Sequence, residues 1–251
     1  MAKRSNLRSQ RKKSKVFNFL IFLFCVSFFV YFGKIRILKI INNLGRIIIK
    51  DIEIAGSKNI TKAEIKELLP FKIGDSFVGI NLSKTGEEIK KIKPELKNIV
   101  IIPGWHKIKI KFYERIPEAF VLYNNKIFGV DFDNVIFPLR GFMNKIKVPV
   151  IIYKSAYERR LVLDFIKKFK AISGSFFFSV LDVKFNNIGD VVFTIKNNTT
   201  VIWGDWMYEN LLNKFRKFMR IYNDATSKYR KIEYIDMSFY SYGKAIVKPI
   251  I

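Results

Sequence analysis

Residues 47–69, IIIKDIEIAGSKNITKAEIKELL, decide the fold of the first folded part of this 251-residue chain. Apolar and polar residues alternate up to Gly56, a period of two that predicts a strand with one buried face. Thr61 and Glu64 have the T-x-x-E spacing of a capping box, in which each side chain bonds to the other residue's backbone N–H. A helix is therefore expected to begin at Thr61 and to stop at Pro70, which cannot continue it.

The sequence that follows completes a small domain. A second helix is expected from about Ser83, followed by two strands, at residues 97–102 and from Lys107, where apolar side chains alternate with polar ones. The element order is then β-α-α-β-β. We therefore predict a small, mixed-layer α+β domain over residues 47–116.

Residues 117–251 are expected to form a second domain, a mixed β-sheet with two helices. AFVLYNNKIFGVDFDNVIFPL, residues 119–139, reads as three short strands joined by two turns, because Asn tolerates the positive φ that tight turns need. Amphipathic helices are predicted over residues 156–171 and from about 208 to 222, with three strands between them. The chain closes on two more strands in YIDMSFYSYGKAIVKPII, residues 234–251.

The N-terminal part has a different character. Residues 1–15 are basic without an acidic side chain, and residues 16–33 are then uncharged and rich in Phe, Leu, Ile and Val. Such a run spans roughly 26 Å as a helix, which predicts a single transmembrane helix at residues 16–33. The denser basic tail favours a cytoplasmic N-terminus. We therefore expect a single-pass protein of the cell inner membrane, with a juxtamembrane linker at residues 34–46 and both domains on the periplasmic or extracytoplasmic side.

No arrangement of side chains predicts catalysis. The single histidine, His106, follows a Pro-Gly-Trp turn, and the single cysteine, Cys25, lies within the apolar run. The sequence contains no nucleotide-binding loop, nucleophile elbow or zinc-protease motif. Asp131 and Asp133 fit either a metal pair or a turn, and we favour the turn because no third ligand stands nearby. The sequence thus predicts a protein that is not an enzyme and that has no metal and no cofactor.

The formal net charge of +25 indicates an anionic partner, such as nucleic acid, a membrane surface or an anionic wall polymer. Specific binding of nucleic acid is not expected, because no zinc-finger, helix-turn-helix or RNP pattern accompanies the charge. The basic residues after residue 50 are also scattered along the elements instead of clustered on one. An anionic wall polymer stays open as an alternative partner.

Three stretches resemble the POTRA domain: IEIAGSKNITKAEIKELL (52–69), GDSFVGINLSK (74–84) and IKIKFYERIPEA (108–119). One such module after a basic tail and an apolar run is similar to the FtsQ/DivIB family of bacterial cell-division proteins, and the resemblance covers nearly the whole chain. It implies an FtsQ-type β domain at residues 117–251 and a non-catalytic scaffold that couples septal wall synthesis to division. The alternative is a POTRA-bearing component of protein export or outer-membrane assembly.

The resemblance also implies where partners bind. In this family the terminal strands bind an FtsB-like protein, which is paired with an FtsL-like protein in a coiled coil, and other membrane proteins of the division machinery are further partners. YIDMSFYS, residues 234–241, is similar to the family's run at this place. The implied partner-binding residues are Tyr234, Asp236, Phe239, Tyr240, Tyr242, Lys244 and Lys248.

The pattern of the terminal strands suggests how such a partner would bind. Alternate residues from Ile235 to Phe239 share one strand face and can enter the core, which leaves Tyr240 on the other face and Tyr242 in the turn. An incoming chain would extend the sheet by backbone pairing and pack on these two tyrosines, so that replacing both by Ala would weaken binding without unfolding the domain. The alternative is that the aromatic residues only complete a core beside a solvated edge, which two lysines partly blunt.

Overall fold

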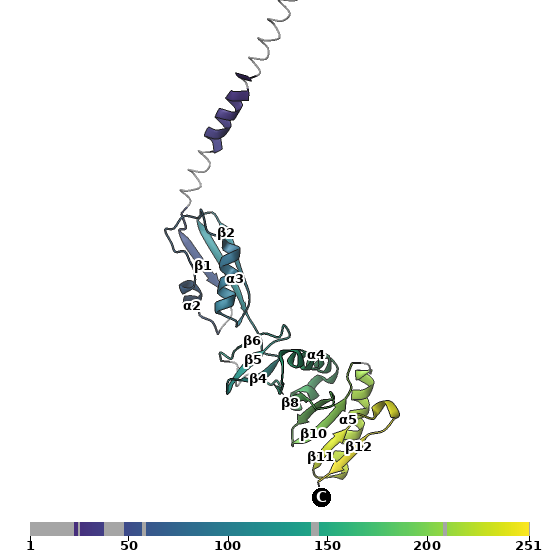
Figure 1. Ribbon diagram of the computed structural model, residues 1–251. Coiled ribbons are helices and arrows are strands. Elements are labelled where there is room, and N and C mark those ends of the chain that lie inside the picture. Colours follow the sequence, from purple (N-terminus) through teal and green to yellow (C-terminus); the bar gives the residue numbers. More distant parts are fainter. Residues whose placement is uncertain are drawn as a thin grey trace, which may run out of the picture. The chain divides into compact units, whose positions relative to one another are not determined.

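The computed structural model of the protein describes residues 23–24, 26–37, 48–56, 59–141, 146–207 and 210–250 (Figure 1). Within these ranges the chain is α+β and contains two separate sheets. It divides into two compact units. The first contains the described residues up to Ile54 together with 69–85 and 101–110, and the second contains 55–68, 86–100 and the described residues from Lys111 onward.

The prediction of a membrane-spanning helix at residues 16–33 is contradicted. None of the helices among the described residues combines the length and the apolar character needed to cross a membrane. This finding contradicts the prediction of a single-pass protein of the inner membrane with a cytoplasmic N-terminus.

Several N-terminal predictions fall on residues that lie outside the described ranges. They are the basic tail at residues 1–15, residues 16–22 of the predicted anchor, Cys25, and most of the predicted linker at residues 34–46.

The first sheet has three strands in the order β1-β3-β2. The elements run β1 (Asp51–Ala55), α2 (Lys62–Glu67), α3 (Leu82–Ile92), β2 (Leu96–Gly104) and β3 (Lys107–Glu114), which is the order that the sequence predicts. The capping box at the start of α2 is present, since the Thr61 hydroxyl accepts from the Glu64 backbone N–H at 3.2 Å and Glu64 Oε1 accepts from the Thr61 N–H at 3.3 Å. The central strand β3 alternates buried Ile and Phe with exposed residues.

The second sheet is large and mixed. Its nine strands lie in the order β12-β11-β10-β9-β8-β7-β4-β5-β6, with parallel pairs at β4–β7, β7–β8 and β10–β11 and antiparallel pairs elsewhere. The strands are β4 (Ala119–Tyr123), β5 (Lys126–Val130), β6 (Ile136–Pro138), β7 (Val150–Ile151), β8 (Val180–Phe185), β9 (Val191–Ile195), β10 (Thr199–Gly204), β11 (Ile232–Asp236) and β12 (Ile246–Pro249). The turn between β4 and β5 is the predicted Asn pair, with φ of 49° and 59°.

Two long helices, α4 (Ala156–Ser173) and α5 (Leu211–Lys228), pack on one face of this sheet. The Phe193 ring of β9 lies 5.2 Å from that of Phe169 in α4 and 6.4 Å from that of Phe218 in α5, centroid to centroid. Trp203 of β10 also contacts both helices, at 5.4 Å and 5.9 Å from the same two rings. Since both helices contact the same side chains, they cover the same face, and the aromatic core lies between them and strands β9 and β10.

Two short 3-10 helices complete the second unit. The segment η1 (Gly174–Ser179) continues α4, and η2 (Tyr240–Tyr242) lies between the last two strands. The position of η2 matters for the candidate site, because it precedes the final strand of the chain.

Candidate partner-binding edge

Strand β12 forms one border of the nine-stranded sheet (Figure 1, yellow). It pairs antiparallel with β11, with Tyr234 opposite Lys248, Ile235 opposite Val247 and Asp236 opposite Ile246. In the part of the chain that the structure describes, no strand pairs with the other side of β12. The two terminal strands predicted from the sequence are therefore present, and the second of them is an open edge.

One residue of β12 has both its backbone N–H and its backbone C=O directed away from β11. The Ile250 N–H donates to the Lys231 carbonyl at 3.1 Å, across the pair of strands. Residues two apart in an antiparallel strand point to the same neighbour, so Lys248 and Ile246 also face β11, and Val247 faces outward. Pro249 faces outward too but has no N–H to donate. The open edge thus offers the N–H and C=O of Val247 and the C=O of Pro249.

Strand β11 ends at Asp236 because a side chain turns the backbone there. Asp236 Oδ1 accepts from the Ser238 N–H at 2.8 Å and from its hydroxyl at 2.6 Å. The strand alternation expected up to residue 240 therefore stops early. Met237 is fully buried, as the pattern indicates, but Phe239 is 46% exposed where the pattern places it in the core.

A glycine on the neighbouring strand makes room for this turn. Gly204 ends β10 with φ of +79°, and a Cβ on it would lie 2.7 Å from Ser238 Cα. A side chain at this position would collide with backbone, which cannot move aside as a flexible side chain can. Position 204 must be glycine because of a contact with a residue 34 positions away in the sequence. The local sequence therefore does not predict it.

The two tyrosines of η2 have different surroundings. The Tyr240 ring is half-buried and has the Lys214 and Lys217 ammonium groups of α5 at 5.6 Å and 5.8 Å from its centroid. Tyr242 is 78% exposed. Tyr240 is therefore part of the packing of α5 against the turn, and Tyr242 is the tyrosine whose ring is open to an incoming chain.

The remaining predicted residues lie on or beside β12. Lys248 Nζ lies 2.9 Å from Glu233 Oε2 and 5.8 Å from the centroid of the Tyr234 ring. The hydrogen bond from Glu233, together with its charge, raises the pKa of Lys248 above its ordinary value. Lys244 is exposed just ahead of the strand, and its backbone N–H donates to the Phe239 carbonyl at 3.2 Å. The structure thus places all seven predicted residues on β11, β12 and the segment that joins them.

The opposite border of the sheet is tied to earlier parts of the chain by ion pairs. Arg115 Nε donates to the Pro94 carbonyl at 3.1 Å, and Arg115 Nη1 binds the Asp131 carboxylate. Asp131 is only 4% exposed, and its Oδ1 accepts from the N–H groups of Asp133 at 3.1 Å and Val135 at 3.2 Å. These are the bonds of the turn that the sequence predicts between β5 and β6.

A second arginine, Arg140, contacts two carboxylates just after β6. Its Nη1 lies 2.5 Å from Glu64 Oε2, and its Nε lies 3.0 Å from Glu95 Oε1, an ion pair that does not reach hydrogen-bond geometry. Lys93 Nζ also binds Glu64 Oε2, at 2.8 Å. Hydrogen bonds from Lys93 and then Arg140 lower the pKa of the Glu64 carboxyl from 4.5 to about 2. The sequence does not signal these pairs, because their members lie far apart in it.

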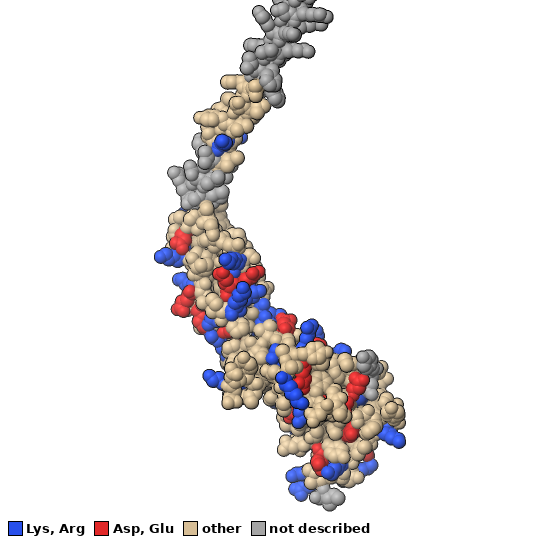
Figure 2. All heavy atoms as spheres, viewed as in Figure 1, with Lys and Arg blue, Asp and Glu red and all other residues tan. Residues whose placement is uncertain are grey.

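Other places considered from the sequence carry no ligand chemistry. His106 lies in the β2–β3 hairpin with φ of 55°, and its Nδ1 is 2.8 Å from the Ile48 carbonyl oxygen. A search of the described residues finds no group of three or more His, Cys, Asp or Glu side chains arranged to hold a metal. On the face that Figure 2 shows, Lys and Arg are interspersed with Asp and Glu.

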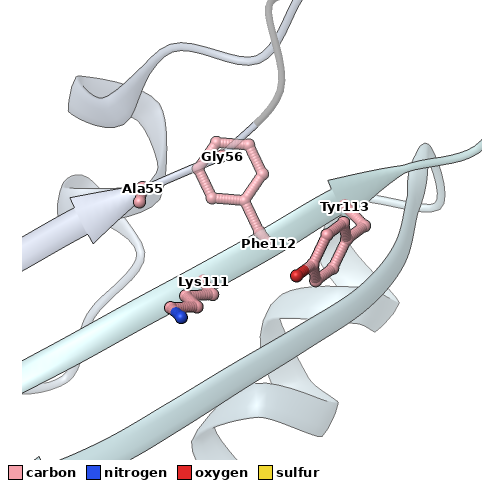
Figure 3. Close-up of a pocket in the computed structure, with 5 residues that line it drawn as sticks. All are labelled: Ala55, Gly56, Lys111, Phe112 and Tyr113. Atoms are coloured by element: carbon pink, nitrogen blue, oxygen red, sulfur yellow. The ribbon is translucent and has the colours of Figure 1, made fainter.

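A shallow hollow of about 430 Å³ lies where β1 ends beside β3. It is lined by Ala55, Gly56, Lys111, Phe112 and Tyr113 (Figure 3). The Phe112 ring fills the space over Gly56, where a Cβ would lie 2.2 Å from the ring. Lys111 and Tyr113 point to the other strand face, because alternate residues do. The polar groups therefore do not converge on a ligand.

A scan against protein-family models finds no match to this chain, and a search of the curated proteins finds no relative.

Proposed function

We propose that this protein is a non-catalytic scaffold of the bacterial division machinery, of the FtsQ/DivIB type. In this proposal it recruits an FtsB-like protein, paired with an FtsL-like protein, through strand addition at β12, and it thereby couples septal wall synthesis to division. The observation that carries the proposal is the open side of β12, toward which the alternation of the strand directs the N–H and C=O of Val247.

Strand addition suits this edge because it relies on backbone pairing, which supplies affinity without an invariant side chain. The side chains that flank the edge are exposed and apolar or aromatic, and they can give such pairing its specificity: Ile246, Phe239 and Tyr242. Pro249 shortens the available edge, since it removes one donor, and so limits pairing with unrelated chains. The partner's strand is therefore expected to centre on Val247.

The decisive experiment removes the outward donor of β12 and leaves the bonds to β11 in place. Val247→Pro deletes the N–H that faces away from the sheet, whereas Lys248→Pro deletes an N–H that faces β11. With a co-expressed FtsB-like and FtsL-like coiled-coil pair as the probe, we expect Val247→Pro to fold and to lose at least about tenfold in affinity, equivalent to about 1.4 kcal/mol. Full affinity in a folded Val247→Pro protein would overturn strand addition at β12.

Crosslinking identifies the partner independently. A photo-reactive amino acid in place of Tyr242 is expected to capture the FtsB-like protein. The matched control is the same amino acid at Ile188, which is 83% exposed but lies in the turn between β8 and β9. Capture of a barrel protein at Tyr242 would instead support the export or outer-membrane assembly function, and capture of nucleic acid would contradict both.

Of the two tyrosines predicted to contact the partner, only Tyr242 can be replaced without disturbing the turn. Because Tyr240 packs against α5, its replacement changes the turn as well as any contact. Tyr242→Ala alone is the cleaner test, and it is expected to weaken binding while the unfolding midpoint stays unchanged.

A further inference from the structure

Helix α5 contains a fully buried cation. Lys214 is 0% exposed. Its ammonium group donates to the Asp205 carbonyl at 3.2 Å and lies 5.3 Å from the centroid of the Trp203 ring and 5.6 Å from that of Tyr240. Burying an ammonium group is costly unless oxygen atoms or aromatic faces replace the lost water. The surroundings of Lys214 provide both, and one of the two rings belongs to η2.

A second lysine of α5 contacts the same turn. Lys217 follows Lys214 by three positions, so both lie on neighbouring parts of one helix face. Its Nζ is 5.8 Å from the centroid of the Tyr240 ring and donates to the Gly243 carbonyl at 3.4 Å. Helix α5 therefore contacts the ring of Tyr240 in η2 and the backbone of Gly243, three residues before β12 begins at Ile246.

We propose that Lys214 is a positioning residue for the β12 edge: its buried ammonium group holds the Tyr240 ring, and through it the turn at residues 238–244, against α5. The inference deepens the proposed function and rests on it for the statement that β12 binds a partner. The positioning itself does not depend on a partner.

A positioning role predicts a local effect, which distinguishes it from a general role in packing. Removing the buried ammonium group deletes its hydrogen bond to the Asp205 carbonyl and its contacts with the Trp203 and Tyr240 rings. Met would fill the space of Lys214 without any preference for the face of an aromatic ring. The cation is therefore expected to determine where Tyr240 lies, and its loss is expected to affect the turn at residues 238–244 more than the rest of the protein.

The test compares Lys214→Met with Lys168→Met in the full chain. Lys168 is the matched control, because its ammonium group also lies over a ring, 4.7 Å from the Trp206 centroid, but on α4. We measure the unfolding midpoint and amide hydrogen exchange at residues 238–248. Lys214→Met is expected to make exchange in this segment at least tenfold faster while exchange in the central strands changes much less, and Lys168→Met is expected to leave exchange in this segment unchanged.

Two results would overturn the proposal. One is exchange at residues 238–248 that stays at the control level in Lys214→Met. The other is faster exchange throughout the protein together with a lower midpoint, which would show a general loss of packing. Tyr240→Leu provides a second route, since it keeps apolar volume but removes the ring. It should accelerate the same amides, and the double variant should accelerate them by less than the product of the two single effects, because both changes remove the contact between Lys214 and Tyr240.

A binding measurement separates this inference from the proposed function. With the FtsB-like and FtsL-like pair as the probe, Lys214→Met is expected to bind about tenfold more weakly. If Lys214→Met accelerates exchange at residues 238–248 but the wild-type protein does not bind the probe, the positioning role stands and the proposed function is overturned. If the wild-type protein binds the probe tightly but Lys214→Met leaves exchange unchanged, the proposed function stands and the positioning role is overturned.

Discussion

The nine-stranded sheet has two borders, β6 and β12, and neither pairs with a further strand among the described residues, but they differ in the contacts beside them. Beside β6, Arg115 and Arg140 bind side chains and backbone of residues that precede the sheet in the chain. Beside β12, the described residues provide no partner for the outer side of the strand. Uncovered edge strands invite pairing with other chains. The difference teaches that the chain itself secures one border and leaves the other, which we propose as the binding edge.

The largest effect is expected from breaking the secured border. Arg115→Met leaves the buried Asp131 carboxylate without its cation, and losing one partner of a buried pair costs about 3–5 kcal/mol of the free energy of unfolding. Urea denaturation measures the loss. The control is Lys97→Met, because Lys97 Nζ is exposed and lies 4.0 Å from Asp133; it should change the free energy by less than about 0.5 kcal/mol. Equal losses in the two variants would contradict the distinction.

The next effect concerns the turn that ends β11 at the open border. Gly204→Ala forces a Cβ to within 2.7 Å of Ser238 Cα at a φ of +79°, so we expect a loss of about 2–3 kcal/mol in the free energy of unfolding. Gly189→Ala is the matched control, because Gly189 also has positive φ, +90°, but faces open space. It should cost only about 1 kcal/mol. A loss no larger than the control's would mean that the turn moves freely.

A smaller effect, with a pH signature, is expected at Glu64. Its pKa is lowered from 4.5 to about 2 in the folded protein, so its charge stabilises the fold above pH 4.5, and this contribution is lost as the pH falls toward 2. Glu64→Gln should lower the free energy of unfolding at pH 7 by about 1–2 kcal/mol after solvent screening. It should also make stability decline less steeply between pH 4.5 and 2 than in the control, Glu67→Gln. Parallel declines would contradict the ion pairs of Glu64.

The smallest effect is expected at the open border itself. Lys248→Met removes an exposed ion pair with Glu233, and exposed pairs contribute little because water screens them. The unfolding midpoint should therefore not change measurably in thermal denaturation. A shift as large as that of Glu64→Gln would show that the β12 border is secured by charge as well, and the comparison of the two borders would fail.

Much of the local structure could be predicted from the sequence. The Thr61–Glu64 capping box, the Asn turn between β4 and β5 and the aspartate turn after β5 are present as expected. Prediction failed at Phe239, because Asp236 turns the chain after the strand. The prediction of a membrane-spanning helix is also contradicted, because no helix among the described residues combines the necessary length and apolar character.

The candidate site was also predicted only in part from the sequence. The sequence led to the terminal strands, but it did not distinguish Tyr240, which packs against Lys214 and Lys217, from the exposed Tyr242. It contained no signal for the buried position of Lys214, because a lysine on an amphipathic helix normally faces solvent. In the structure this lysine instead contacts the Trp203 and Tyr240 rings and the Asp205 carbonyl.

The sequence by itself determined the helices, most strands and their turns, because capping, alternation and positive φ act within a few residues of one another. The tertiary structure decided which strand became the open border, which carboxylates met Arg115 and Arg140, and which lysine was buried. These features depend on contacts between residues tens of positions apart in the sequence. Their energies come from desolvation and from backbone pairing between strands, which local sequence patterns do not predict.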